Sequence, residues 1–142
     1  MNKISDIDVL LFDVNETLVD ITILEPFFLR VFKNPLVLRS WFAELVLYSQ
    51  TMTASGLYEP FGNLAVGVLR MVGSNHNITI NDDDVSEFKS LLGNMPAHPD
   101  VIPALTRLQT AGFRLATLTN SAPTQSPTLL EKAGISEFFE QQ

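Results

Sequence analysis

The sequence predicts an α/β protein in which two parallel strands, one near each end of the chain, bracket a helical insertion. Apolar runs of strand length occupy residues 7–14 and 113–119, and the pattern between them has the period of helices. Because parallel strands need a long crossover connection, this layout predicts a partial Rossmann-like core, residues 1–20 and 94–142. Residues 21–93 form the insertion.

Composition excludes several classes of protein. A length of 142 residues suits one ordinary domain, or a small core with an inserted lobe. The net charge of −7 predicts no broad basic surface for nucleic acid, and the absence of cysteine excludes disulfides and thiolate metal sites. Neither a membrane-spanning segment nor a secretory signal is apparent, so we expect a cytoplasmic protein without membrane partners.

The first predicted element is a strand over Ile7–Val14. Its residues are almost all apolar, which predicts burial on both faces, as in parallel sheets. Asp13 would then lie at the carboxyl end of the strand, where open α/β sheets place their ligands.

Four helices are predicted in the insertion, and prolines lie at or near the first turn of three of them, where a missing N–H costs nothing. Their ranges are Ile21–Phe32, Pro35 to about Thr53, Glu59–Val72 and Asp82–Leu92. Asn81 or Asp82 is the expected N-cap of the last helix. The acidic run Asp82–Asp84 matches a charged helix start, since it lacks the glycine and distal glutamate of a calcium loop.

Beyond the insertion the pattern reads as linker, helix, strand and helix. Gly93–Pro99 breaks both helix and strand, Asp100–Ala111 is amphipathic, Phe113–Thr119 is an apolar strand, and Pro127–Ala133 is helical. His76 and His98 fall in loops without carboxylate or histidine partners at metal-ligand spacing. We therefore expect both to be surface histidines.

The ends of the two strands gather the polar residues that could perform chemistry. If the strands are parallel neighbours, Asp13 and Thr119 lie side by side, with the Thr17 hydroxyl and the Asn120 amide around the same crevice. The two strand ends would therefore place a carboxylate, two hydroxyls and an amide around one crevice.

These motifs resemble those of the haloacid dehalogenase superfamily. Phe12–Asp20, with the sequence FDVNETLVD, is similar to its first motif, and Leu115–Pro123, LATLTNSAP, to its second. The closest resemblance is to the type II branch, the (S)-2-haloacid dehalogenases, whose helical cap the insertion resembles. Arg39 falls where that branch carries a cap arginine.

The resemblance implies a hydrolase for 2-haloalkanoic acids that needs no metal or other cofactor. Asp13 would displace halide from C2 and form an ester, which water would hydrolyse to a 2-hydroxy acid. The residues implied to hold the halide are Arg39 and Asn120, and those implied to orient the carboxylates are Thr17 and Thr119. Asn15, Tyr58, Phe61 and Ser121 are the implied substrate-binding residues.

Asn15 distinguishes this reaction from that of the magnesium-dependent phosphatases of the same superfamily, which remain the alternative. Those enzymes place a second aspartate two residues after the nucleophile, because an alkoxide leaving group needs a proton. Asn15 cannot act as such an acid, whereas halide leaves without protonation.

The chain departs from the family pattern at its end. It stops at Gln142, before the segment in which the family carries a later lysine and an acidic motif, and Lys132 lies at a different position. We therefore expect a truncated chain, for which an inactive fragment is a further alternative.

The apolar helices over residues 41–48 and 64–72 are expected to form the cap core or a homodimer contact.

Overall fold

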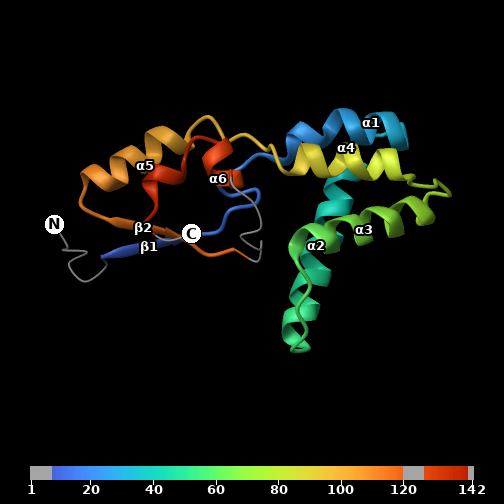
Figure 1. Ribbon diagram of the computed structural model, residues 1–142, viewed down its shortest axis with the longest axis horizontal. Coiled ribbons are helices and arrows are strands. Elements are labelled where there is room, and N and C mark those ends of the chain that lie inside the picture. The colour runs from blue at the N-terminus through green and yellow to red at the C-terminus, as the bar shows by residue number, and fades with distance from the viewer. Residues whose placement is uncertain (1–7, 120–126, 141–142) are drawn as a thin grey trace. The chain divides into compact units, whose positions relative to one another are not determined.

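The computed structural model describes residues 8–119 and 127–140. The chain divides into two compact units. Of the described residues, unit 1 contains residues 8–20, 94–119 and 127–140, and unit 2 contains Ile21–Gly93. Both units are traced in Figure 1.

Unit 1 is built on two parallel strands, β1 (Val9–Phe12) and β2 (Arg114–Thr117). Their register pairs Val9 with Arg114 and Phe12 with Thr117, so both strands end at the same edge. The remaining elements of this unit are α5 (Val101–Thr110), α6 (Leu129–Lys132) and the short 3-10 helix η2 (Ser136–Phe138). Helix α5 runs along the strand pair on one side (Figure 1).

One face of the strand pair is covered. Leu115 is fully buried, and the ring of Phe12 meets Phe139 edge to face at 6.1 Å. The backbone N–H of Glu140 donates to the Leu115 carbonyl, and Arg114 Nε donates to the Glu140 carboxylate at 2.9 Å. This hydrogen bond to Arg114 lowers the pKa of Glu140, since it favours the charged carboxylate.

The opposite face of the strand pair is exposed. Val9, Leu11 and Leu118 keep 40%, 66% and 70% of their surface accessible. The prediction of burial on both faces is therefore wrong for β1. An apolar run shows that a strand can be covered on both sides, but the covering layers must come from other segments.

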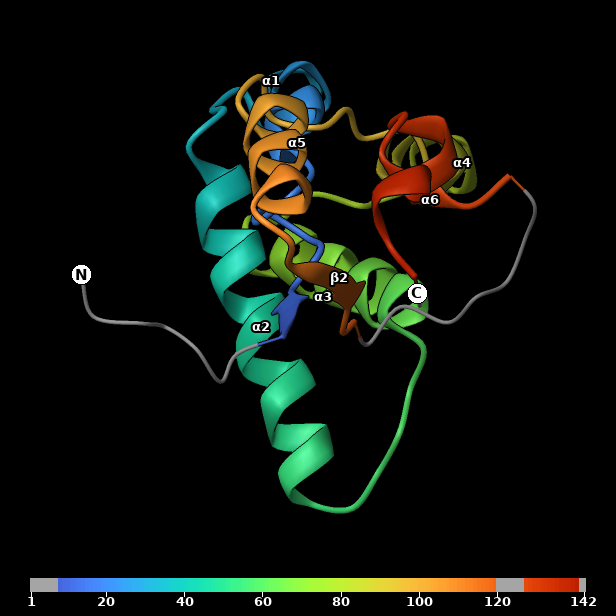
Figure 2. The same ribbon diagram turned by 90° about the vertical axis from the view of Figure 1, so that its left-hand side faces the viewer.

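Unit 2 is helical throughout its described elements. They are the 3-10 helix η1 (Ile21–Leu24) followed by α1 (Glu25–Phe32), α2 (Val37–Ala54), α3 (Phe61–Asn75) and α4 (Asp82–Leu92). Helices α1 and α4 lie side by side (Figure 1). The C-terminal half of α2 extends away from the other helices of this unit (Figure 2).

Aromatic side chains form the core of unit 2. Phe27, Phe28, Trp41 and Phe88 are fully buried, and the Trp41 ring meets Phe88 edge to face at 5.2 Å. The indole N–H of Trp41 donates to the Ala65 carbonyl at 3.2 Å, so the buried ring keeps a hydrogen bond.

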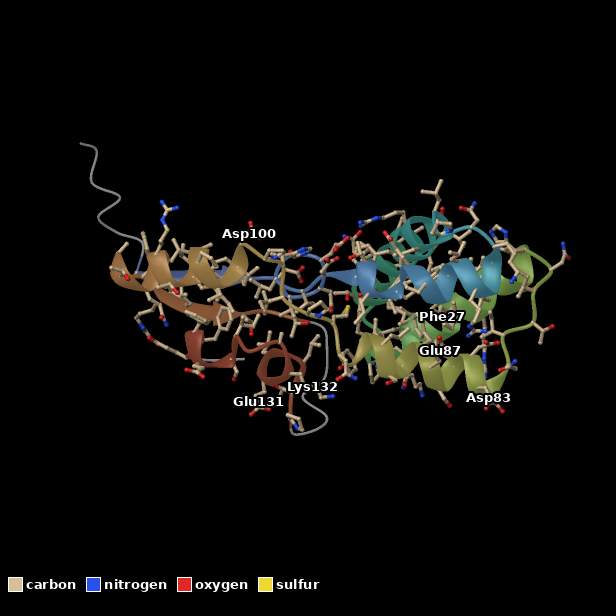
Figure 3. The ribbon with its side chains drawn as sticks, turned by 90° about the horizontal axis from the view of Figure 1, so that it is seen from above. Phe27, Asp83, Glu87, Asp100, Glu131 and Lys132 are labelled. Carbon is tan, nitrogen blue, oxygen red and sulfur yellow. The ribbon has the colours of Figure 1, made fainter. Side chains whose placement is uncertain are left out.

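An ion-pair cluster joins α1 to α4. Arg30 Nη2 donates to Asp84 Oδ1 at 2.9 Å and also pairs with Glu87, while its guanidinium lies over the Phe27 ring. Figure 3 shows Phe27 and Glu87 between these helices. The hydrogen bond from Arg30 to Asp84 raises the pKa of Arg30. Asp84 also completes a capping box with Asn81, the N-cap of α4.

The helices agree with the sequence prediction to within a few residues. Asp82–Leu92 begins and ends as predicted, and the first predicted helix starts with the 3-10 turn η1 before α1 continues it. The strands are shorter than predicted, and η2 was not predicted. Among the described residues, no helix has both the length and the apolarity needed to span a bilayer.

Candidate active site

The candidate site begins where β1 ends. Asp13 directly follows Phe12, the last residue of the strand, and its side chain is exposed. The N–H of Leu118 donates to the Phe12 carbonyl at 2.8 Å, so the backbone pairing continues one residue past β2. Thr119 comes next and is partly exposed. Asp13 and Thr119 therefore both follow strand ends at the carboxyl edge of the strand pair.

A tight turn after Asp13 brings Thr17 back to the carboxylate. The N–H groups of Leu18 and Val19 both donate to the Val14 carbonyl, at 2.9 and 3.1 Å. With the chain folded back in this way, Thr17 Oγ1 donates to Asp13 Oδ2 at 3.0 Å. Asp13 and Thr17, which are four residues apart in the sequence, are thus joined by a direct hydrogen bond.

Glu16 gives this turn its shape. Its φ of 63° is left-handed, a conformation that costs a residue with a side chain roughly 1–2 kcal/mol. Its N–H donates to the Val19 carbonyl at 2.9 Å, which closes the turn. Asn15 is partly exposed in the same turn and makes an isolated bridge with Val19.

Three of the remaining predicted residues lie outside unit 1. Arg39 is exposed on α2, Tyr58 keeps 67% of its surface accessible in the segment before α3, and Phe61 is the first residue of α3. All three belong to unit 2. Asn120 and Ser121 lie outside the described residues.

Beside the turn lies a cluster that the sequence reasoning missed. His98 Nε2 is 3.7 Å from Glu16 Oε1, and His98 Nδ1 is 3.9 Å from Asp20 Oδ2. The expectation of a surface histidine without carboxylate partners is therefore wrong for His98. Its partners are about 80 positions away in the sequence, so ligand spacing along the chain could not reveal them.

Pairing between two chain segments produces this cluster. The N–H of Asp20 donates to the Pro96 carbonyl at 2.8 Å, and the N–H of His98 donates to the Leu18 carbonyl at 3.0 Å. A sequence signal for this cluster was Asp20, a carboxylate at the end of the first motif for which the sequence predicted no role. Glu16, Asp20 and His98 offer one imidazole and two carboxylates as possible metal ligands.

The arrangement at Asp13 can perform nucleophilic chemistry. A carboxylate at a strand end is accessible from solvent, and a hydroxyl fixes the orientation of one of its oxygens. Two residues further on lies Asn15. Its amide cannot donate a proton as a carboxylic acid at that position would.

A family model described as a hydrolase, haloacid dehalogenase-like, matches residues 7–142. None of the curated proteins matches the sequence.

Several solved structures share the fold. The L-2-haloacid dehalogenase of Xanthobacter autotrophicus, with chloropropionic acid covalently bound, is 20% identical with a TM-score of 0.82, and the match covers 95% of this chain and 55% of that one. The L-2-haloacid dehalogenase RSc1362 is 23% identical with a TM-score of 0.86, and the match covers 95% of this chain and 62% of that one. A predicted phosphoglycolate phosphatase of Haemophilus somnus is 17% identical with a TM-score of 0.54, and the match covers 97% of this chain and 62% of that one. The chain thus spans little more than half the length of these proteins.

Proposed function

The chain belongs to the haloacid dehalogenase-like hydrolases, and from this membership we propose that Asp13 is its nucleophile and a 2-haloalkanoic acid its substrate. The observation that carries the proposal is the hydrogen bond from Thr17 Oγ1 to Asp13 Oδ2 at the end of β1. It orients the carboxylate, so that Oδ1 presents a lone pair to the substrate.

The proposed reaction has two steps. In the first, Asp13 Oδ1 attacks C2 of the haloacid, the carbon–halogen bond breaks with inversion, and halide leaves with the bonding electrons. In the second, water attacks the carbonyl carbon of the Asp13 ester, which releases the 2-hydroxy acid and a proton and regenerates the carboxylate. The leaving group takes no proton, in agreement with the amide at Asn15.

The other residues take the roles that the family resemblance implies. Arg39 and Asn120 stabilise the charge that develops on the halide, the interaction that contributes most to catalysis of this type. Thr119 and Ser121 lie with Asn120 in the segment after β2, where they assist in binding the carboxylates. In this proposal unit 2 is the cap, and its Tyr58 and Phe61 exclude water and contact the carbon chain.

The test is halide release from (S)-2-chloropropionate by the wild-type chain and by Asp13→Asn. Loss of the nucleophile is expected to lower turnover by at least about 1,000-fold. A single turnover in water labelled with ¹⁸O should place the label in Asp13 and leave the first product unlabelled. Undiminished turnover by Asp13→Asn, or label in the first product, would overturn the proposal.

A second candidate is a phosphatase, favoured by the structural similarity to the predicted phosphoglycolate phosphatase. It predicts magnesium-dependent hydrolysis of p-nitrophenyl phosphate, with Asp13 forming an acyl phosphate. Asn15 opposes it, because an alkoxide leaving group would then lack its proton donor. Halide release without phosphate release decides for the dehalogenase.

A further inference from the structure

The cluster of Glu16, Asp20 and His98 has no role in the reaction proposed above. One ligand atom from each residue lies within 4.8 Å of the others. The three side chains are partly buried, with 20%, 25% and 28% of their surface accessible in the order given. They are therefore shielded from bulk water but reachable by a small ion.

The distances within this cluster are too long for direct hydrogen bonds. The ring nitrogens of His98 lie 3.7 and 3.9 Å from the carboxylate oxygens, whereas an N–H to oxygen hydrogen bond spans roughly 2.7–3.2 Å. One ion can bind only one ring nitrogen of His98, and with one ligand atom from each residue the three atoms lie within 4.8 Å of one another. Ligand atoms bound at about 2.0–2.2 Å around one metal ion lie roughly 3–3.6 Å apart. Binding therefore requires the three side chains to rotate toward a common centre.

The donor set and its charge select the kind of ion. Two carboxylates and a neutral imidazole carry a charge of −2, which one divalent cation neutralises. Imidazole with carboxylate suits Zn²⁺ and its first-row neighbours such as Mn²⁺ and Co²⁺. Ca²⁺ is disfavoured, because it requires six to eight oxygen ligands.

The backbone already holds these side chains together before any ion binds. Hydrogen bonds from Asp20 to Pro96 and from His98 to Leu18 join the segment 13–20 to the segment 94–99. Val19 and Ala97 form an antiparallel bridge between the same two segments. Little ordering is then required on binding, so three protein ligands can give useful affinity.

From this geometry we propose that Glu16, Asp20 and His98 form a structural site for a divalent first-row metal ion. The ion joins the turn that carries Thr17 to the segment where the chain returns from unit 2 to unit 1. It is separate from the chemistry of Asp13, so the site stands whether or not the chain is a dehalogenase.

Titration of the chain with ZnCl₂ and with MnCl₂ in a calorimeter tests the proposal. Saturable binding with one ion per chain is expected, together with a rise in melting temperature. His98→Ala and Glu16→Gly should each weaken binding by roughly 10- to 100-fold. Glu16→Gly also guards against misfolding, because a φ of 63° suits glycine without strain.

Two control variants remove similar groups elsewhere. His76→Ala removes the other histidine, and Asp83→Asn removes an exposed carboxylate of α4 (Figure 3). Both should bind the metal as the wild type does. With Mn²⁺ bound, pulsed electron paramagnetic resonance should detect an imidazole ¹⁴N coupling that His98→Ala abolishes.

Three results would overturn the proposal. One is the absence of saturable binding up to about 1 mM metal. Another is unchanged affinity in both His98→Ala and Glu16→Gly. The third is a melting temperature that changes with pH but not with added metal. It would show that a protonated His98 pairs with the two carboxylates and that no metal ion joins them.

Discussion

Thr17 is joined to Asp13 by a single hydrogen bond of 3.0 Å. A hydrogen bond to a charged group contributes about 1.5–3 kcal/mol, so Thr17→Val should slow halide release by roughly 10- to 100-fold. Thr17→Ser keeps the hydroxyl and should retain most of the activity. The measurement is kcat for chloride release from (S)-2-chloropropionate.

Thr117→Val is the matched control for that substitution. Among the described residues, the buried Thr117 hydroxyl has no hydrogen-bond partner. Its removal should leave kcat unchanged and raise the free energy of unfolding, since an unsatisfied buried hydroxyl costs about 1–3 kcal/mol. Equal loss of activity in Thr17→Val and Thr117→Val would show that the Thr17 contact has no specific role.

Gly73 occupies a place in α3 that admits no side chain. A Cβ built there would lie 2.9 Å from the Ile78 carbonyl oxygen and 2.8 Å from Ile80 Cγ1. Gly73→Ala should therefore lower the free energy of unfolding by about 1–3 kcal/mol. Gly67 lies in the same helix with open space around it, and Gly67→Ala should stabilise by about 0.5–1 kcal/mol. Urea unfolding of both variants checks the opposite signs.

At the residue level, local patterns were informative and long-range ones were not. The spacing of Asp13 and Thr17 indicated a shared site, and the structure adds the hydrogen bond between them. The position of His98 beside Glu16 and Asp20 depends on pairing between segments far apart in sequence, which no local pattern contains.

Among the elements, the contact between α1 and α4 allows a sharp comparison of two ion pairs. Arg30 pairs with Asp84, whose side chain is 10% exposed, and with Glu87, whose side chain is 47% exposed. Asp84→Ala should lower the free energy of unfolding by about 2–3 kcal/mol, because it also removes the capping box. Glu87→Ala should cost at most about 1 kcal/mol, as exposed pairs do.

Thermal unfolding of these two variants provides the test. If Glu87→Ala proves as destabilising as Asp84→Ala, the capping role of Asp84 is wrong.

The helices were predictable because their signals are local. The prolines near helix starts, the N-cap Asn81 and the acidic first turn of α4 all lie within a few residues of the boundary they mark. The strand ends were less accurate, since hydrogen bonding to a partner decides where a strand stops. The exposure of one face of β1 was also not predicted, because burial of a strand face depends on other segments that pack against it.

For the whole molecule, the two units offer separate spectroscopic reports of unfolding. The single Trp and both Tyr residues of the chain lie in unit 2, where Trp41 is fully buried. Hydrogen exchange of the β1 and β2 amides reports on unit 1 instead. We expect these amides to lose protection at lower urea than the Trp41 transition, because unit 1 has one exposed sheet face and four-residue strands. Coincident transitions would show one cooperative unit.

The exposed stripe of Val9, Leu11 and Leu118 also governs how separate copies behave toward one another. With a net charge of −7, the molecules repel each other in dilute buffer. Salt at physiological strength limits that repulsion to about 8 Å, within which the apolar stripes of two copies can meet. Ionic strength therefore sets the colloidal stability of this protein, and concentrated stocks should stay clear longest at low salt.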